Sequence, residues 1–246
     1  MPDEYQNPEY NTYERLSALA EGCRSNLKTA YESVEAVCEE KEALGNLATN
    51  FVISAFRTGL QANSDDVGAV TARETLASYS KNITEEAFAI GANVTALRVR
   101  KLERMLVVSK QLDRIKLAAA EHQEPSRKML EELKDLAAVI VNYDNVVTHG
   151  FTDIEYCEES FINRADNMYG GDIAQKRSEN PKSAVLNTLH QEYETQIEEI
   201  KRRKRETKTF TKSKQGIIEY HVLGDILNKI KEEETELEMY LGSRGM

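Results

Sequence analysis

Tryptophan is absent from this 246-residue chain, and residues that break helices are scarce. Only four prolines occur, and only Pro125 and Pro181 lie beyond residue 8. No apolar run approaches the roughly 18 to 20 residues that span a bilayer, so we expect no transmembrane helix. The N-terminal sequence MPDEYQNPEYNTYE is acidic and polar, which is not typical of a secretory signal. These absences favour long helices in a cytoplasmic protein.

Cysteines are also few. Cys23, Cys38 and Cys157 are odd in number and widely spaced. A disulfide framework needs an even number of cysteines, and a zinc site needs closely spaced pairs of ligands. We therefore interpret the three cysteines as reduced and mostly buried, as is typical of a cytoplasmic protein.

Sequence motifs of catalysis are missing. The histidines are isolated, and none forms a His-x-x-x-His pair: His122, His149, His190 and His221. The chain has no glycine-rich phosphate loop and no Gly-x-Ser-x-Gly motif. We expect no enzymatic activity, no metal ion and no cofactor.

What the chain does contain is a sustained heptad of apolar residues. In the first segment the spacing alternates between four and three residues, and predicts one helix over about 9–62. Its stripe consists of Leu16, Ala20, Cys23, Leu27, Ala30, Val34, Val37, Lys41, Leu44, Ala48, Phe51 and Ala55. The polar run 63–66 ends this helix and supplies capping residues for the next one.

Further helices follow the same pattern. A second stripe predicts a helix from about 67 to His122, with Lys101 interrupting it and with Leu102 and Leu106 widening it to touch two neighbours. A third stripe runs from Leu130 to Met168. Gly170-Gly171 is predicted to end that helix, with the sequence DIAQKRSEN as a loop. A last helix begins near Pro181 and extends to about 241.

Pro125 leaves two architectures open. If it marks a turn, the chain forms an up-down bundle of four helices. If it marks a kink, the middle helix is about 100 residues, or roughly 150 Å, long. Part of its apolar stripe would then be buried best by a second copy of the chain. Because no strand-like alternation of useful length is present, we expect an all-α fold of long antiparallel helices in either case.

Two basic windows stand out against a formal net charge of -10. Residues 201–214 carry eight Lys or Arg and one Glu, a net of +7, and residues 98–116 carry seven basic and two acidic residues, a net of +5. In the first window the stripe positions fall on Lys204, Thr207, Thr211 and Lys214. We therefore expect the helix to lose its core stripe there and to present an almost wholly basic surface.

Such a surface favours an anionic membrane, because each Lys or Arg near anionic lipid gains about 1 kcal/mol. Nucleic acid is a less suitable partner. Only Phe210 is interleaved with the basic run, and the many carboxylates of the chain would repel a polyanion.

The layout resembles the BAR superfamily of membrane-curving dimers, including its extended F-BAR branch. The resemblance rests on the long first helix, the long second segment with KLERMLVVSKQLDRIK, and the start of the last helix at Asn180-Pro181-Lys182-Ser183. It covers most of residues 9–241. It implies a single helical domain over 9–241, with a flexible N-terminus at 1–8 and a tail at 242–246.

By this resemblance the protein would be a cytoplasmic, peripheral membrane homodimer that senses or generates curvature. The implied membrane-binding residues are Arg98, Arg100, Lys101, Arg104, Lys201, Arg202, Arg203, Lys204, Arg205, Lys208, Lys212 and Lys214, with Lys176, Arg177 and Lys182 near the tip of an arm.

The first two helices also resemble, more weakly, the helical part of Abl-interactor-type scaffold subunits. That resemblance implies the alternative function: a helical scaffold or adaptor subunit of a larger cytoskeletal or trafficking assembly.

Overall fold

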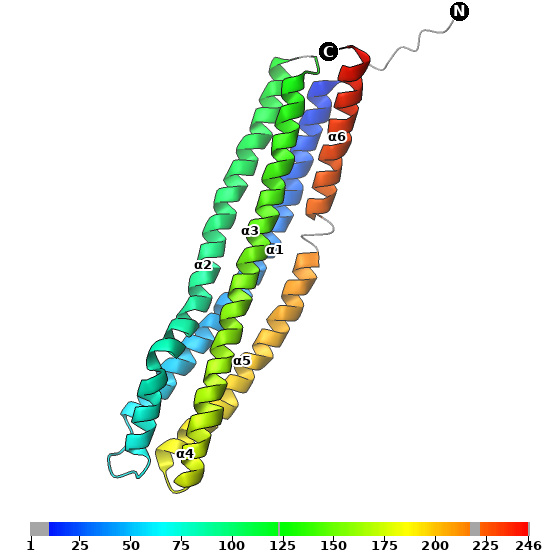
Figure 1. Ribbon diagram of the computed structural model, residues 1–246. Coiled ribbons are helices and arrows are strands. Elements are labelled where there is room, and N and C mark those ends of the chain that lie inside the picture. The colour runs from blue at the N-terminus through cyan, green and yellow to red at the C-terminus, as the bar shows by residue number, and fades with distance from the viewer. Residues whose placement is uncertain (1–9, 123, 217–221, 246) are drawn as a thin grey trace, which may run out of the picture. The chain divides into compact units, whose positions relative to one another are not determined.

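The computed structural model describes residues 10–122, 124–216 and 222–245, and every regular element within these ranges is helical. The five long helices are α1 (Thr12–Leu60), α2 (Ala69–Glu121), α3 (Arg127–Ala165), α5 (Ala184–Gly216) and α6 (Gly224–Ser243). The longest of them, α2, has 53 residues (Figure 1). The all-α prediction is thus confirmed. The predicted flexible N-terminus at 1–8 lies outside the described residues.

The helices form two compact units. Unit 1 comprises the described residues of Met1–Val34, Val99–Val147 and Lys214–Met246, and unit 2 comprises Glu35–Arg98 and Thr148–Ser213. The helices α1, α2 and α3 each contribute one segment to both units, while α6 completes unit 1 and most of α5 completes unit 2. The single domain expected over 9–241 stays a prediction.

The core of each unit follows the heptads of the sequence. All twelve stripe positions predicted for the first helix are buried in α1, including Lys41, which is fully enclosed. Small stripe residues such as Ala20 and Ala30 in unit 1 and Ala48 in unit 2 leave room for neighbouring helices to pack closely. The apolar period therefore predicted which face of this helix points inward.

Helices α2 and α3 pack antiparallel, and Pro125 lies in the connection between them. In unit 2, Arg164 binds Glu86 at 2.8 Å and the Asn93 side chain donates to Cys157 at 3.0 Å. In unit 1, Gln111 donates to the carbonyl of Glu132 at 3.1 Å. Residue numbers rise along α2 while those of their partners fall along α3. The turn alternative is therefore confirmed, and the kinked helix of about 100 residues is wrong.

The prediction that Gly170-Gly171 ends the third helix is also wrong. The chain continues as a π-helix, η1 (Asp166–Ile173), and then as α4 (Ala174–Glu179). Tyr169 of η1 is buried, with its ring centroid 5.0 Å from that of Phe51 and 5.8 Å from that of Tyr193. Packing of this ring holds the backbone helical where glycine propensity alone favours a loop.

Asp66 joins the beginnings of two helices in unit 2. One carboxylate oxygen accepts hydrogen bonds from the Gly68 backbone N–H at 2.8 Å and the Ser183 hydroxyl at 2.6 Å. The other accepts from the backbone N–H groups of Ala184, at 2.6 Å, and Val185. These bonds lower the pKa of Asp66, the Ser183 bond most strongly. The polar run 63–66 thus caps α5 as well as the helix that follows it.

Candidate functional site

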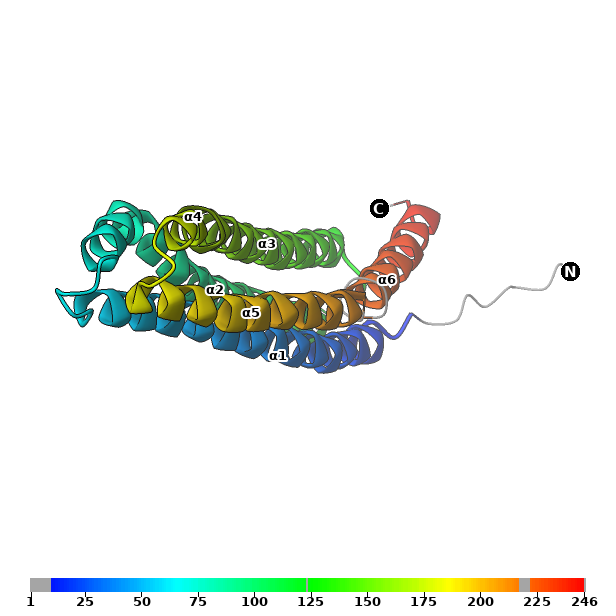
Figure 2. The same cartoon turned by 90° about the horizontal axis from the view of Figure 1, so that it is seen from below.

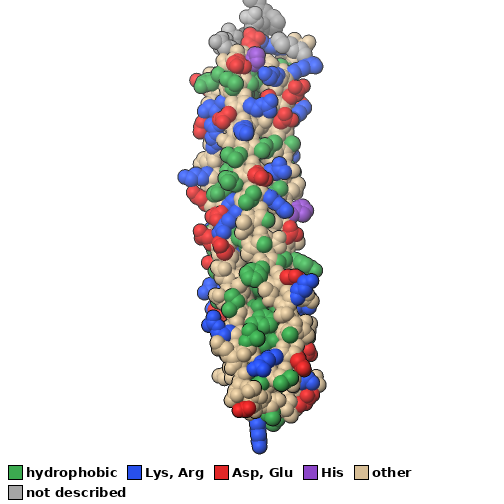
Figure 3. All heavy atoms as spheres, turned by 90° about the vertical axis from the view of Figure 1, so that its left-hand side faces the viewer, with side chains coloured by type: hydrophobic (Ala, Val, Ile, Leu, Met, Phe, Trp, Pro, Cys, Tyr) green, Lys and Arg blue, Asp and Glu red, His purple; other side chains and the backbone are tan. Residues whose placement is uncertain are grey.

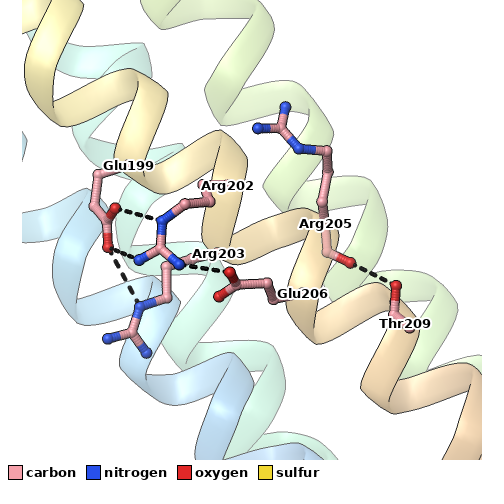
Figure 4. Close-up of polar contacts among 6 residues, drawn as sticks. All are labelled: Glu199, Arg202, Arg203, Arg205, Glu206 and Thr209. Carbon is pink, nitrogen blue, oxygen red and sulfur yellow. Dashed lines mark hydrogen bonds and ion pairs between the residues drawn. The ribbon is translucent and has the colours of Figure 1, made fainter.

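Two arginines of the basic run of α5 bond to carboxylates of their own helix. Arg202 bonds to Glu199 at 2.6 Å and to Glu206, one turn away on either side. Arg203 also approaches Glu199, at 3.5 Å. Figure 4 shows Arg202 between the two glutamates, with the Arg205 guanidinium pointing away from them. The bonds from Arg202 lower the pKa of Glu199. The positive charge of Arg202 is therefore paired with carboxylates of its own helix.

Two further lysines of the run face carboxylates of other segments in unit 2. Lys201 bonds to Asp166 of η1 at 2.9 Å, and Lys204 forms an ion pair with Glu159 of α3. Burial lowers the pKa of Lys204, with the nearby charge of Glu158 opposing that shift. Both lysines therefore help to hold α5 in the unit.

The core stripe of α5 persists through the basic run, contrary to the sequence prediction. Thr207 and Thr211 are each 2% exposed. The Thr211 hydroxyl donates to the carbonyl of Thr207 at 2.7 Å, which satisfies its polar group inside the unit. Inward positions are thus filled by threonine, and the surface of the helix is not wholly basic.

Three basic residues of α5 are exposed and have no carboxylate partner among the described residues: Arg205, Lys208 and Lys212. They are spaced three and four residues apart, so they lie on one helix face. The last predicted residue of the run, Lys214, is half-buried in unit 1. Of the predicted basic surface on α5, the face of Arg205, Lys208 and Lys212 remains available to an anionic partner.

The basic window of α2 also contains both paired and unpaired arginines. Arg98, in unit 2, bonds to Glu42 at 2.6 Å and to Glu35 at 2.7 Å, and these bonds raise its pKa. Arg100 and Arg104 are exposed in unit 1 without a carboxylate partner among the described residues.

Lys101, predicted to bind membrane, is fully buried in unit 1. Its ammonium group lies 3.9 Å from the centroid of the Tyr31 ring, a cation–π contact. The heptad already placed Lys101 on the inward stripe, and the structure confirms that position. Its charge is therefore not part of the exposed basic surface.

The predicted tip residues lie around the start of α5. In α4, Lys176 bonds to Glu179 at 3.3 Å and Arg177 donates to the Asn187 side chain at 2.8 Å. Lys182 is exposed in the connection before α5. Only Lys182 of these three lacks a polar partner among the described residues.

The outward face of α2 in unit 1 carries exposed apolar side chains, two of which the sequence analysis had placed against neighbouring helices. Leu102 and Leu106, expected to touch neighbouring helices, are more than half exposed. With Val99, Val107 and Leu117 they form what we call the outer stripe. Val99 and Leu117 are 18 residues apart, about five turns, and so point the same way. Figure 3 shows this side of the molecule, with hydrophobic side chains among charged ones.

The outer stripe is unusual within its own unit. Among the described residues of unit 1, the other exposed large apolar side chains are single ones: Tyr13 on α1, Val141 on α3 and Met239 on α6. Four of these side chains lie between residues 99 and 107, and Leu117 lies beyond the exposed Lys110 and Asp113. A concentration of exposed apolar side chains of this kind is a candidate interaction surface. The 18-residue repeat between Val99 and Leu117 was the sequence signal for it.

The described ranges contain no metal site and no membrane-spanning helix. No group of three or more His, Cys, Asp or Glu side chains is placed there to hold a metal ion. None of the helices in these ranges is long and apolar enough to cross a bilayer. None of the three cysteines forms a disulfide bond. Cys23 and Cys38 are buried and Cys157 is half-buried, which confirms the predicted burial.

No protein-family model, curated protein or solved structure matches this chain.

Proposed function

We propose that this protein is a helical scaffold or adaptor whose partner docks on the outer stripe of α2. The observation that carries the proposal is the concentration of five exposed large apolar side chains on that face of unit 1. A soluble helix gains nothing in the free chain by presenting Leu102 and Leu106 to water, whereas covering them removes apolar area at roughly 25 cal/mol per Å².

The chemistry of the stripe favours an amphipathic helix as the partner. Val99, Leu102 and Leu106 have the three-and-four spacing of a coiled-coil seam, which accepts the side chains of a second helix between them. Charges of both signs border it: Arg100, Glu103 and Lys110 are exposed and have no partner among the described residues. A helix with apolar residues at heptad spacing and matching edge charges would satisfy both features.

The test is affinity purification of the tagged full chain from cells, combined with lysine cross-linking and mass spectrometry. Proteins that bind the stripe are expected to cross-link through Lys110. They should be lost from the Leu102→Glu/Leu106→Glu variant and retained by Val141→Glu, which changes an exposed apolar residue on α3 of the same unit. Identical sets of captured and cross-linked proteins for all three chains would contradict the proposal.

A second candidate function is favoured by the α5 face of Arg205, Lys208 and Lys212. These three exposed cations support attraction to an anionic bilayer, at about 1 kcal/mol each near its surface. This is the activity of the BAR-like membrane-curving homodimer that the sequence resembles. The pairing of Arg202 and Lys204 with carboxylates reduces the basic surface to this narrower face.

Liposome co-sedimentation tests the membrane function. Wild-type protein should pellet with phosphatidylserine-rich vesicles and not with neutral ones, and replacing Arg205, Lys208 and Lys212 by Glu should abolish pelleting. The matched control replaces three exposed cations of unit 1, Arg127, Lys128 and Lys231, by Glu, with the same change in net charge. Equal pelleting with both vesicle types, or equal loss in both triple variants, would rule out an α5 membrane face.

A further inference from the structure

We infer that the partner on the outer stripe is an acidic amphipathic helix, with its carboxylates along the side of the stripe that faces α3. The inference rests on the docking role proposed above and adds the charge of the partner and the side on which that charge lies. Within unit 1 the two edges of the stripe differ. The edge toward α1 is neutralised by ion pairs, whereas the edge toward α3 carries exposed cations that lack carboxylate partners among the described residues.

The edge toward α1 forms a closed set of ion pairs. Asp113 of α2 pairs with Arg24 of α1, and Lys116 of α2 bonds to Glu21 of α1 at 2.6 Å. Arg24 also bonds to Glu21, at 3.2 Å. Two cations and two carboxylates thus neutralise one another, so this edge offers a charged partner little net attraction.

The edge toward α3 carries free positive charge. Gln111 marks this side of α2, since its side chain donates to the Glu132 carboxylate of α3 at 2.6 Å. Arg104 and Arg100 precede Gln111 by seven and eleven residues, close to two and three helical turns, so they lie on the same side. Both arginines are exposed and have no carboxylate partner among the described residues.

Arg114 extends this row of cations, which we call the basic edge: Arg100, Arg104 and Arg114. Arg114 is 64% exposed, with its Nε 4.0 Å from the Glu132 carboxylate. Lys110 adds an exposed cation on the outward face, and Glu103 is the only unpaired carboxylate among the described residues of α2 from 99 to 117. The unpaired charge beside the stripe is therefore mainly positive, which favours an acidic partner.

A helix fits the two unlike edges better than an anionic bilayer does. One side of a docked helix can carry carboxylates beside the basic edge, while its other side stays uncharged beside the ion pairs with α1. A bilayer is anionic throughout, and would also bring its headgroups to the exposed carboxylates of Glu21 and Asp113. The net charge of -10 opposes an acidic helix only weakly, because charges farther away than about 8 Å are largely screened at physiological salt.

Two synthetic helices test the charge of the partner. Each has about three heptads with Leu at positions a and d, and they differ only in carrying Glu or Lys at positions e and g, which opposes pairing of either peptide with itself. In fluorescence anisotropy with the full chain, the Kd of the Glu peptide should be lower than that of the Lys peptide by about tenfold or more. Equal binding of the two peptides, tighter binding of the Lys peptide, or no binding of the Glu peptide would overturn the inference.

Charge reversal on the protein tests the position of the basic edge. Arg100→Glu/Arg104→Glu should raise the Kd of the Glu peptide about tenfold and lower that of the Lys peptide, because the edge becomes acidic. Lys229→Glu/Lys231→Glu changes two exposed cations of α6 in the same unit, with the same change in net charge, and should leave both Kd values unchanged. Equal effects of the two double variants would show that net charge attracts the peptide, and would refute a role for the basic edge.

The variant Leu102→Glu/Leu106→Glu separates the inference from the proposed function. Circular dichroism should show the same helix content as in the wild type, and neither peptide should bind. If this variant binds the peptides as the wild type does, the docking role of the outer stripe fails. If its binding is lost but the wild type binds both peptides equally, the docking role stands and only the acidic partner is excluded.

Two other occupants of the stripe would give different results with the same variant. Wild-type protein that binds neither peptide, but pellets with phosphatidylserine-rich vesicles only while Leu102 and Leu106 are intact, would assign the stripe to a bilayer. Wild-type protein that binds neither peptide and sediments as a dimer, which the variant dissociates, would assign it to a second copy of the chain. Either result would overturn the acidic helix.

Discussion

Lys41 and Lys101 occupy inward positions of their heptads, yet the two units enclose them differently. In unit 2, Lys41 forms an ion pair with Glu158 at 2.8 Å, and both side chains are fully buried. In unit 1, Lys101 is buried over the face of Tyr31. Lys41 thus contacts a buried anion, and the ammonium group of Lys101 contacts the face of an aromatic ring.

The difference lies in what remains when either member of the contact is removed. Burial raises the pKa of Glu158, with the charge of Lys41 opposing that shift, and one Glu158 oxygen accepts no hydrogen bond from the described residues. Losing Lys41 leaves a buried carboxylate without its counter-charge, which is costly. The Tyr31 ring, by contrast, carries no formal charge, so removing it leaves no anion unpaired. Removing Lys41 from unit 2 and removing the Tyr31 ring from unit 1 should therefore differ in their cost to stability.

The largest expected effect is from breaking the ion pair of unit 2. Lys41→Met alone or Glu158→Leu alone should lower the free energy of unfolding at pH 7 by about 3–5 kcal/mol, measured by urea denaturation. The double variant Lys41→Met/Glu158→Leu should recover most of this loss, since apolar groups then fill the site. Single variants as stable as the wild type would show that the pair is not enclosed as described.

The cost of Lys41→Met should shrink in acid. Without Lys41 the pKa of Glu158 rises further above its ordinary value, so the folded state holds a proton that the unfolded state releases. Stability relative to the wild type is then regained as pH falls through the folded pKa, by up to about 1.4 kcal/mol per pH unit. Urea denaturation at pH 7 and at pH 5.5 measures the difference, and an equal gap at both would argue against a buried carboxylate.

A smaller effect is expected in unit 1. Tyr31→Leu keeps apolar contact but removes the ring, and should lower the free energy of unfolding by about 1–2 kcal/mol. Tyr156→Leu provides the control, because that tyrosine is 74% exposed on α3. A loss of stability in Tyr31→Leu as large as that in Glu158→Leu would contradict the expected difference between a cation–π contact and a buried ion pair.

The smallest effect should come from the exposed ion pairs of α5. Arg202→Ala removes contacts to Glu199 and Glu206 at the surface, where water screens the charges. We expect no measurable change in the midpoint of urea denaturation. If Arg202→Ala shifts the midpoint as much as Tyr31→Leu does, then exposed ion pairs stabilise the fold as much as this buried contact does.

The sequence predicted what depends on local spacing. The α1 stripe was predicted in full, because the heptad itself selects the inward face, and the same rule placed Lys101 inside. The bonds of Arg202 were also readable, since Glu199 and Glu206 lie three and four residues away.

Contacts between segments that are distant in the sequence could not be predicted from local spacing. The partners of Lys201 and Lys204 come from η1 and α3, so those charges seemed free in the sequence. The helix likewise continues through Gly170-Gly171 because Tyr169 packs against Phe51, a residue over a hundred positions earlier. Leu102 and Leu106 were recognised as apolar, but only the packing of unit 1 shows that they face outward.

Asp66 has a consequence for synthesis on the ribosome. Its carboxylate bonds to Ser183, Ala184 and Val185, which follow it by 117 to 119 residues. At the usual rate of 5–20 residues per second, a nascent chain waits roughly 6 to 24 seconds between making Asp66 and making the start of α5. The bonds from Asp66 to the start of α5 can therefore form only after the whole of α1, α2 and α3 has been synthesised.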